Sequence, residues 1–253
     1  NASAKPGRSV LSVAVMASAV FILLAVDVFR KDATADVGPR SGVGGYALIA
    51  ESLLPLAHDL GTGEGRAAAG VTGLDGASVE PFRLRPGDDT SCLNLYQPSN
   101  PRVLGVPASF IDRGRFRFSA SLAATDAERA NPWTLLTKAQ ADGTVPVIAD
   151  ANSLAYVLHK AVGDIIELPH GAGVARLRVV AALQDSLFQG ELLVADEAFL
   201  RLFPEQGGYR VWLIETPPGV SAAVTASIEQ ALAPFGVDVL PSTDRLAEFH
   251  RVE

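Results

Sequence analysis

The sequence has one cysteine, Cys92, among its 253 residues. A single cysteine cannot form a disulfide within the chain, and it excludes the paired-cysteine motifs of metal and redox sites. Histidine is also scarce, because His58, His159, His170 and His250 stand far apart and no two have the spacing of about three to five residues that begins a zinc site. We therefore expect no metal site and no cofactor.

Positive charge is in short supply as well. The chain has 21 Lys and Arg against 28 Asp and Glu, a net charge of -7, and no basic stripe, which argues against a nucleic-acid partner. No G-x-x-x-x-G-K-[ST] loop occurs, so any nucleotide hydrolysis must belong to another chain. The glycines of SGVGGYA at 41–47 precede an expected strand, whereas a dinucleotide-binding fingerprint follows one.

One stretch resembles a catalytic motif. GVSAA at 219–223 is close to the G-x-S-x-G elbow, and Ser221, Asp238 and His250 follow the chain order of a hydrolase triad. Pro217 and Pro218 lengthen a connection that an elbow needs to be tight, so Ser221 is more simply a helix N-cap. We name no catalytic residues. Asp88 and Asp89 are expected in a polar turn, and Trp133 and Trp212 are expected to be packing residues.

Against these absences stands one long apolar run. Ser9 to Val26, SVLSVAVMASAVFILLAV, has 18 residues without a charge. As a helix it would be about 27 Å long, close to the roughly 30 Å of a bilayer core. Its polar members, Ser9, Ser12 and Ser18, can bond back to the helix backbone. The run therefore predicts a membrane-spanning helix.

A removable export signal is the alternative for this run. Lys5 and Arg8 make a basic start, and Ala33-Thr34-Ala35 has the A-x-A pattern of a cleavage site. The run is nevertheless longer than the usual apolar region of a signal, and the charged DVFRKDATAD separates it from that site. We favour a retained anchor, whose orientation stays open because two basic residues flank each side.

Two small residues in this run are candidate helix-contact positions. Ala14 and Ser18 have small-xxx-small spacing, which lets a neighbouring membrane helix approach closely. Replacing both by leucine is expected to weaken such packing.

The rest of the chain alternates between short strands and a few helices. A loop is expected at 61–70, irregular structure at 114–132, and an amphipathic helix in RLAEFHRVE. A helix is expected at 153–161, where Asp150 and Asn152 could act as its caps. Val220, Val224, Ile228 and Leu232 recur every fourth residue along another helix, between the strands at 211–215 and 237–240. Strands are expected from Tyr46 and at 77–85, 102–110, 145–150, 162–168 and 175–183, and a strand followed by a short helix is expected within 191–203. These elements predict an α+β fold.

Several passages together resemble the FtsX-like, MacB-like permease subunits of bacterial ATP-binding-cassette (ABC) systems. NASAKPGRSVLSV resembles the cytoplasmic approach and first helix of such a permease, and RKDATADVGPRSGVGGYALIAES resembles the entry into its extracytoplasmic domain. VPVIADANSLAYVLHKAVGDIIEL and ARLRVVAALQDSLFQGELLVADEAFLRLFP are similar to its later strands, turn and short helix.

The resemblance implies a two-lobed MacB-like periplasmic core domain behind one transmembrane helix. Residues 1–35 would be the cytoplasmic approach and that helix, 36–120 plus 205–245 the first lobe, 121–204 an inserted strand-rich second lobe, and 246–253 the start of a helix returning to the membrane. The bulk of the chain would lie on the periplasmic or extracellular side of the bacterial inner membrane.

The resemblance also implies partners. They are a separate ABC ATPase subunit, a second permease subunit or half, membrane lipid and a periplasmic or outer partner; the cargo of such a non-enzymatic permease would be lipid, lipoprotein, peptide or drug. The alternative is a secreted or anchored enzyme or ligand-binding domain with a signal-like start. A reading frame that continues past Glu253 into another apolar span of about 20 residues would favour the permease.

Overall fold

The computed structural model describes residues 10, 13–22, 37–87, 100–171 and 173–252. The chain divides into an N-terminal unit, residues 1–35, and a main unit, residues 36–253. In the N-terminal unit, residues 13–22 are helical. Among the described residues, no helix is both long enough and apolar enough to cross a membrane. The predicted span from Ser9 to Val26 thus lies partly outside the described residues.

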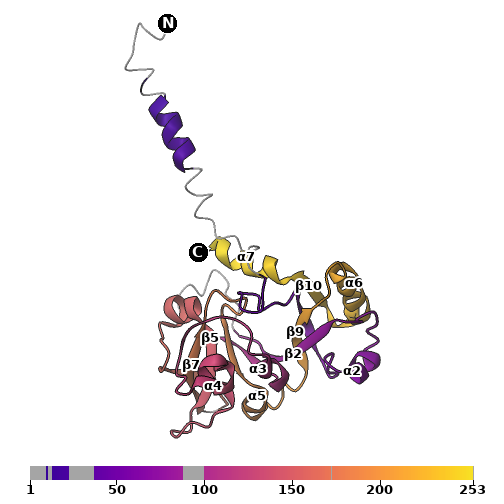
Figure 1. Ribbon diagram of the computed structural model, residues 1–253. Coiled ribbons are helices and arrows are strands. Elements are labelled where there is room, and N and C mark those ends of the chain that lie inside the picture. Colours follow the sequence, from indigo (N-terminus) through magenta and orange to yellow (C-terminus); the bar gives the residue numbers. More distant parts are fainter. Residues whose placement is uncertain (1–9, 11–12, 23–36, 88–99, 172, 253) are drawn as a thin grey trace. The chain divides into compact units, whose positions relative to one another are not determined.

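The main unit is built on one mixed sheet of ten strands (Figure 1). Its order is β10-β1-β9-β2-β3-β8-β5-β7-β4, and β6 pairs with β7. β3 and β8 are parallel to each other, as are β5 and β7, and the other pairs are antiparallel. The strands are β1 Leu48–Leu56, β2 Ser78–Arg85, β3 Arg102–Val106, β4 Phe118–Ser121, β5 Val145–Asp150, β6 Ile165–His170, β7 Gly173–Leu183, β8 Glu191–Ala195, β9 Tyr209–Glu215 and β10 Val237–Pro241.

Short helices connect these strands, and the α+β prediction is confirmed. The α-helices are α2 Gly63–Ala68, α3 Ala108–Arg113, α4 Asp126–Ala130, α5 Asp196–Leu202, α6 Ser221–Leu232 and α7 Ser242–Val252. η1 Pro132–Thr137 and η3 Ala233–Phe235 are 3₁₀ helices, and η2 Ser153–Leu158 is a π-helix.

Two apolar cores lie in different parts of the main unit. One joins β1, β2, β9 and β10 to α6, through Val224, Ile228 and Leu232 on the helix. The other, which we call the second core, joins β3, β5, β6, β7 and β8 to α5 through Phe199. Since both cores share one continuous sheet, residues 36–253 form one compact unit. The division into two lobes stays a prediction.

Most predicted strands are confirmed, but four local predictions are wrong. The expected loop at 61–70 contains α2, because the Thr62 side chain accepts a bond from the Gly65 amide and caps the helix. The expected irregular stretch at 114–132 holds β4 and α4, where Thr125 and Glu128 form a reciprocal capping box. In both places a side-chain cap stabilises a helix too short to show apolar periodicity.

The other two errors concern where elements end. The expected strand at 102–110 ends at Val106, because Pro107 has no amide hydrogen for the ladder and precedes α3. The helix expected at 153–161 is a π-helix that ends at Leu158, since His159 adopts a left-handed conformation with φ 51°. Of the two residues predicted to cap it, Asn152 makes no side-chain capping bond, whereas the Asp150 side chain accepts the Asn152 amide at 2.9 Å and so caps the helical residues 151–158.

Candidate functional site

The hydrolase-like residues do not form a catalytic arrangement in the described structure. The Ser221 hydroxyl lies 2.7 Å from the hydroxyl of Thr216. A hydroxyl is no general base, so this contact does not activate the serine. Val220 is the N-cap of α6, so the N-cap prediction for Ser221 is wrong. Asp238 lies on β10, and the side chain of His250 is outside the described part of the chain.

The other predicted positions are accounted for by packing, or fall outside the structure. Within the described ranges, no three His, Cys, Asp or Glu side chains come together to hold a metal ion. Trp133 and Trp212 are buried, which confirms them as packing residues. Cys92, Asp88 and Asp89 lie outside the described residues.

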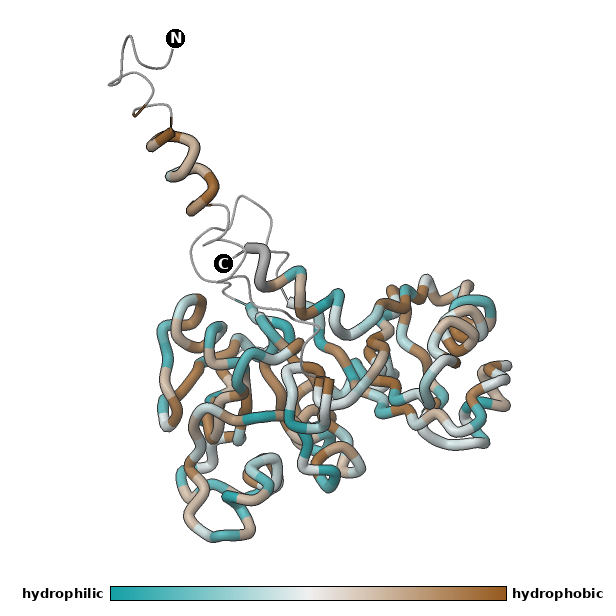
Figure 2. Tube along the Cα trace, turned by 45° about the horizontal axis from the view of Figure 1, so that its top comes forward, coloured by the Kyte–Doolittle hydropathy of each residue, from teal (hydrophilic) through white to brown (hydrophobic). Residues whose placement is uncertain are grey.

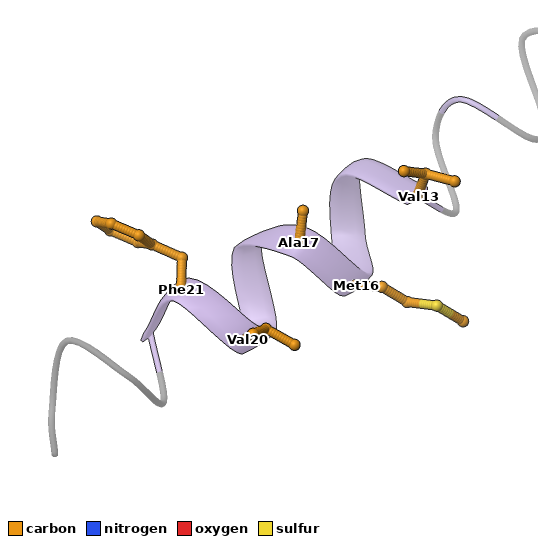
Figure 3. A pocket seen from close by; sticks show the side chains of 5 residues that line it. All are labelled: Val13, Met16, Ala17, Val20 and Phe21. Atoms are coloured by element: carbon orange, nitrogen blue, oxygen red, sulfur yellow. The ribbon is translucent and has the colours of Figure 1, made fainter.

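The helix at 13–22 is apolar except for Ser18. Figure 2 shows it mostly in the hydrophobic colours, and in Figure 3 the side chains of Val13, Ala17 and Phe21 point away from those of Met16 and Val20. Met16 is 70% exposed and Phe21 is 71% exposed. Exposing a large apolar side chain to water costs about 1.5–3 kcal/mol relative to burying it. This helix is therefore more stable in an apolar environment than in water.

Ala14 and Ser18 lie on the same helix and are exposed. No described element packs on them, so their role in helix contact stays a prediction.

In the main unit, the segment that enters the sheet and the last helix lie side by side. We call residues 38–47 the entering segment. The Ser242 amide donates to the Ala47 carbonyl at 3.0 Å, and Leu48 pairs with Pro241 across β1 and β10. The buried Leu246 side chain of α7 lies against Gly42. The two segments are therefore in direct contact.

A third element meets these two. We call residues 184–190, between β7 and β8, the connecting segment. Its Leu187 amide donates to the Gly42 carbonyl at 3.0 Å. The Asp185 carbonyl lies so close to Gly42 that a Cβ there would approach it to 2.1 Å. We call the entering segment, α7 and the connecting segment the junction.

Aromatic and cationic side chains hold the entering segment. Tyr46 stacks on Phe110 and Phe116, with ring centroids 6.0 and 6.3 Å apart, and burial raises the pKa of its hydroxyl. The Arg115 guanidinium lies 4.8 Å from the Tyr46 ring centroid, donates to the Gly44 carbonyl at 3.3 Å and pairs with Glu215 at 2.7 Å. Arg115 thus ties the entering segment to β9.

A partly buried charged cluster lies beside α7, and Glu191 is its buried member. Arg102 on β3 pairs with Glu51 on β1 at 2.9 Å and with Glu191 on β8 at 3.2 Å. Burial raises the pKa of Glu191, although Arg102 and Arg245 of α7 act to lower it and Glu51 acts to raise it further. Although burial alone would lower the pKa of Arg102, the carboxylates of Glu191 and Glu51 raise it. The cluster therefore connects three strands and the last helix.

Replacing Glu191 by glutamine should flatten the pH dependence of stability. Because the pKa of Glu191 is raised above its usual value of 4.5, the folded chain keeps this proton to a higher pH than the unfolded chain. This contribution to stability is full below the unfolded pKa of 4.5 and is lost as the pH rises from there through the folded pKa. Melting temperatures from pH 5 to pH 8 measure this slope, which should be shallower in Glu191→Gln.

The control for this measurement is Glu197→Gln, which removes the same charge from an exposed position on α5. It should keep the native slope. Equal slopes in the native chain and in Glu191→Gln would contradict the role given to burial.

Neither the family models nor the curated proteins contain a match to this sequence. Among solved structures, the chain is similar to the periplasmic region of MacB from Actinobacillus actinomycetemcomitans, with 10% identity and a TM-score of 0.41, over 84% of this chain and 95% of the other. It is also similar to the extracellular domain of the ABC-type transporter YknZ from Gram-positive bacteria, with 12% identity and a TM-score of 0.38, over 76% and 99%.

A third similar structure is a domain assigned to a permease protein of Porphyromonas gingivalis, with 9% identity and a TM-score of 0.37, over 77% of this chain and 86% of the other.

The sequence predicts neither the junction nor the charged cluster beside it. Arg102, Glu191 and Arg245 belong to three separate elements, and their meeting depends on the pairing of β3 with β8 and on the course of α7. One signal was available. Glu191 begins the apolar run ELLVA, and a carboxylate at the head of a buried strand needs a cation partner.

Proposed function

We propose that this chain is part of an ABC transporter permease subunit of the FtsX-like, MacB-like type. Residues 1–35 would carry the cytoplasmic approach and the first membrane helix, and the main unit would lie on the periplasmic or extracellular side of the bacterial inner membrane. The observation that carries the proposal is the helix at 13–22, whose exposed side chains are all apolar except that of Ser18. It belongs to an uncharged run of 18 residues.

Coupling in this proposal is mechanical. A separate ABC ATPase subunit moves the cytoplasmic ends of the membrane helices. An α-helix satisfies its own backbone hydrogen bonds, so it crosses lipid and moves as a rod. The entering segment and α7 lie side by side, which supports a main unit that is attached to its membrane helices at one site. Residues 246–253 would then begin a helix that returns to the membrane.

The main unit would change shape in response. The first lobe in this proposal comprises residues 36–120 plus 205–245, and the second, inserted lobe comprises residues 121–204. Partners beyond the ATPase would be a second permease subunit or half, membrane lipid and a periplasmic or outer protein. Cargo would be lipid, lipoprotein, peptide or drug, or the subunit would transmit motion without carrying cargo.

Extraction of bacterial membranes at alkaline pH tests the anchor. The native gene product should stay in the membrane pellet after carbonate treatment, because its apolar helix lies in lipid. In a Met16→Lys, Val20→Lys variant it should shift toward the supernatant, since each charge at the centre of a membrane helix costs about 2.5–3.5 kcal/mol. A conservative Met16→Leu, Val20→Ile variant is the matched control.

Release of the native protein into the supernatant, or its cleavage after Ala35, would contradict the proposal. The second outcome would instead support an exported enzyme or ligand-binding domain.

A further inference from the structure

The connecting segment contains a residue with a left-handed backbone conformation and several buried hydrogen bonds. Among the described residues, those other than glycine with positive φ are Phe116, His159 and Asp185. Asp185 lies in the connecting segment, and the Phe116 amide donates to the Pro39 carbonyl of the entering segment at 2.8 Å. Phe116 has φ 70° and is fully buried, and Asp185 has φ 47°. Such conformations persist only where the surroundings enforce them, and they cluster at switch regions.

The connecting segment is fastened by one fully buried carboxylate. Asp150, at the end of β5, accepts from the Ser186 amide at 2.8 Å and from the Ser186 hydroxyl at 2.9 Å. Its other oxygen accepts from the Asn152 amide at 2.9 Å. The Ser186 hydroxyl in turn accepts from the Phe188 amide at 3.3 Å. The segment is therefore tied to the second core by hydrogen bonds to a charge.

The same segment is bonded at its other residues. The Gly190 amide donates to the Ser153 hydroxyl at 2.8 Å, at the start of η2. Phe188 packs its ring 5.3 Å from Phe116, centroid to centroid. The Leu187 amide of the connecting segment donates to the Gly42 carbonyl of the entering segment. Residues 184–190 thus contact the second core on one side and the entering segment on the other.

We propose that the connecting segment, residues 184–190, is a coupling latch. It passes displacement of the entering segment and α7 to the strands of the second core. Gly42 is the point of contact, since the Asp185 carbonyl and the Leu246 side chain lie against it. The inference rests on the proposed function only in taking the entering segment and α7 as the elements that the membrane helices move.

Amide hydrogen exchange on the whole chain in detergent tests the latch. Ser186→Ala removes the hydroxyl that bonds to Asp150 and to the Phe188 amide. Loss of a hydrogen bond to a charged group should speed exchange of the Leu187 amide by about tenfold or more. If the latch couples the junction, exchange of the Ser242 amide should rise with it. The β7 amides that bond to β5 should keep their protection.

A reciprocal variant begins from α7. Leu246→Ala removes the side chain that rests on Gly42, and because coupling between sites is reciprocal it should also speed exchange of the Leu187 amide. Asp142→Asn is the matched control: it removes a carboxylate from the same half of the sheet, one that pairs with Arg178 at 2.6 Å. It should leave both amides unchanged.

Faster exchange confined to residues 184–190 in Ser186→Ala, or to α7 in Leu246→Ala, would overturn the latch. Unchanged exchange of the Leu187 amide in Ser186→Ala would overturn it too. These outcomes do not depend on lipid or on an ATPase, so they are separable from failure of the membrane proposal.

Discussion

Replacing Gly44 by alanine should lower the free energy of unfolding by about 4 kcal/mol. Gly44 has φ 61°, a conformation that costs other residues about 1–2 kcal/mol. An added Cβ would also lie 2.2 Å from the buried ring of Phe116, which has no free space to move into. Overpacking of this kind costs about 1–3 kcal/mol. Urea denaturation of the chain in detergent measures the change.

Gly70→Ala is the matched control. Gly70 has φ 69°, but a Cβ there would meet nothing within 4 Å. Gly70→Ala should therefore lower the free energy of unfolding only by the cost of the left-handed backbone conformation, about 1–2 kcal/mol. Equal losses in the two variants would show that Phe116 does not pack against the entering segment as described.

Truncating Trp133 to alanine should destabilise the chain by about 3–5 kcal/mol, the usual loss for a buried large aromatic. Trp133 is fully buried, and its ring centroid lies 4.8 Å from that of Phe110. Its indole also donates to the Arg115 carbonyl at 2.7 Å, so the truncation leaves a buried carbonyl unpaired. Urea denaturation gives this difference directly.

A second aromatic residue serves as the control for Trp133. Tyr156 on η2 is 76% exposed, and Tyr156→Ala should change stability by less than about 0.5 kcal/mol. A decrease in the free energy of unfolding below about 1.5 kcal/mol in Trp133→Ala would contradict the packing described for Trp133.

The sequence predicts the regular elements well where side-chain period alone decides them. Val224, Ile228 and Leu232 recur at helical spacing, and all three are buried on α6. Val220, the fourth member of that series, is the exposed N-cap instead. Helix ends depend on local hydrogen bonds, which apolar periodicity does not report.

The junction could not be predicted in this way, because it is made by tertiary contacts. SGVGG has three glycines, yet the sequence does not say that Gly42 faces a backbone carbonyl and Gly44 faces a phenylalanine ring. Asp150 was predicted as a helix cap, and its main role is to bind Ser186, which is 36 residues away along the chain. Such contacts depend on strand order, and a single sequence does not contain that information.

Sidedness of the main unit is the most direct test of the membrane account. Tyr156→Cys, in a chain whose Cys92 is replaced by serine, puts one thiol at a highly exposed position of the main unit. In intact cells a maleimide that cannot cross the inner membrane should label it, whereas Ala4→Cys at the cytoplasmic end should react only after lysis. Labelling of Tyr156→Cys only after lysis would contradict the account.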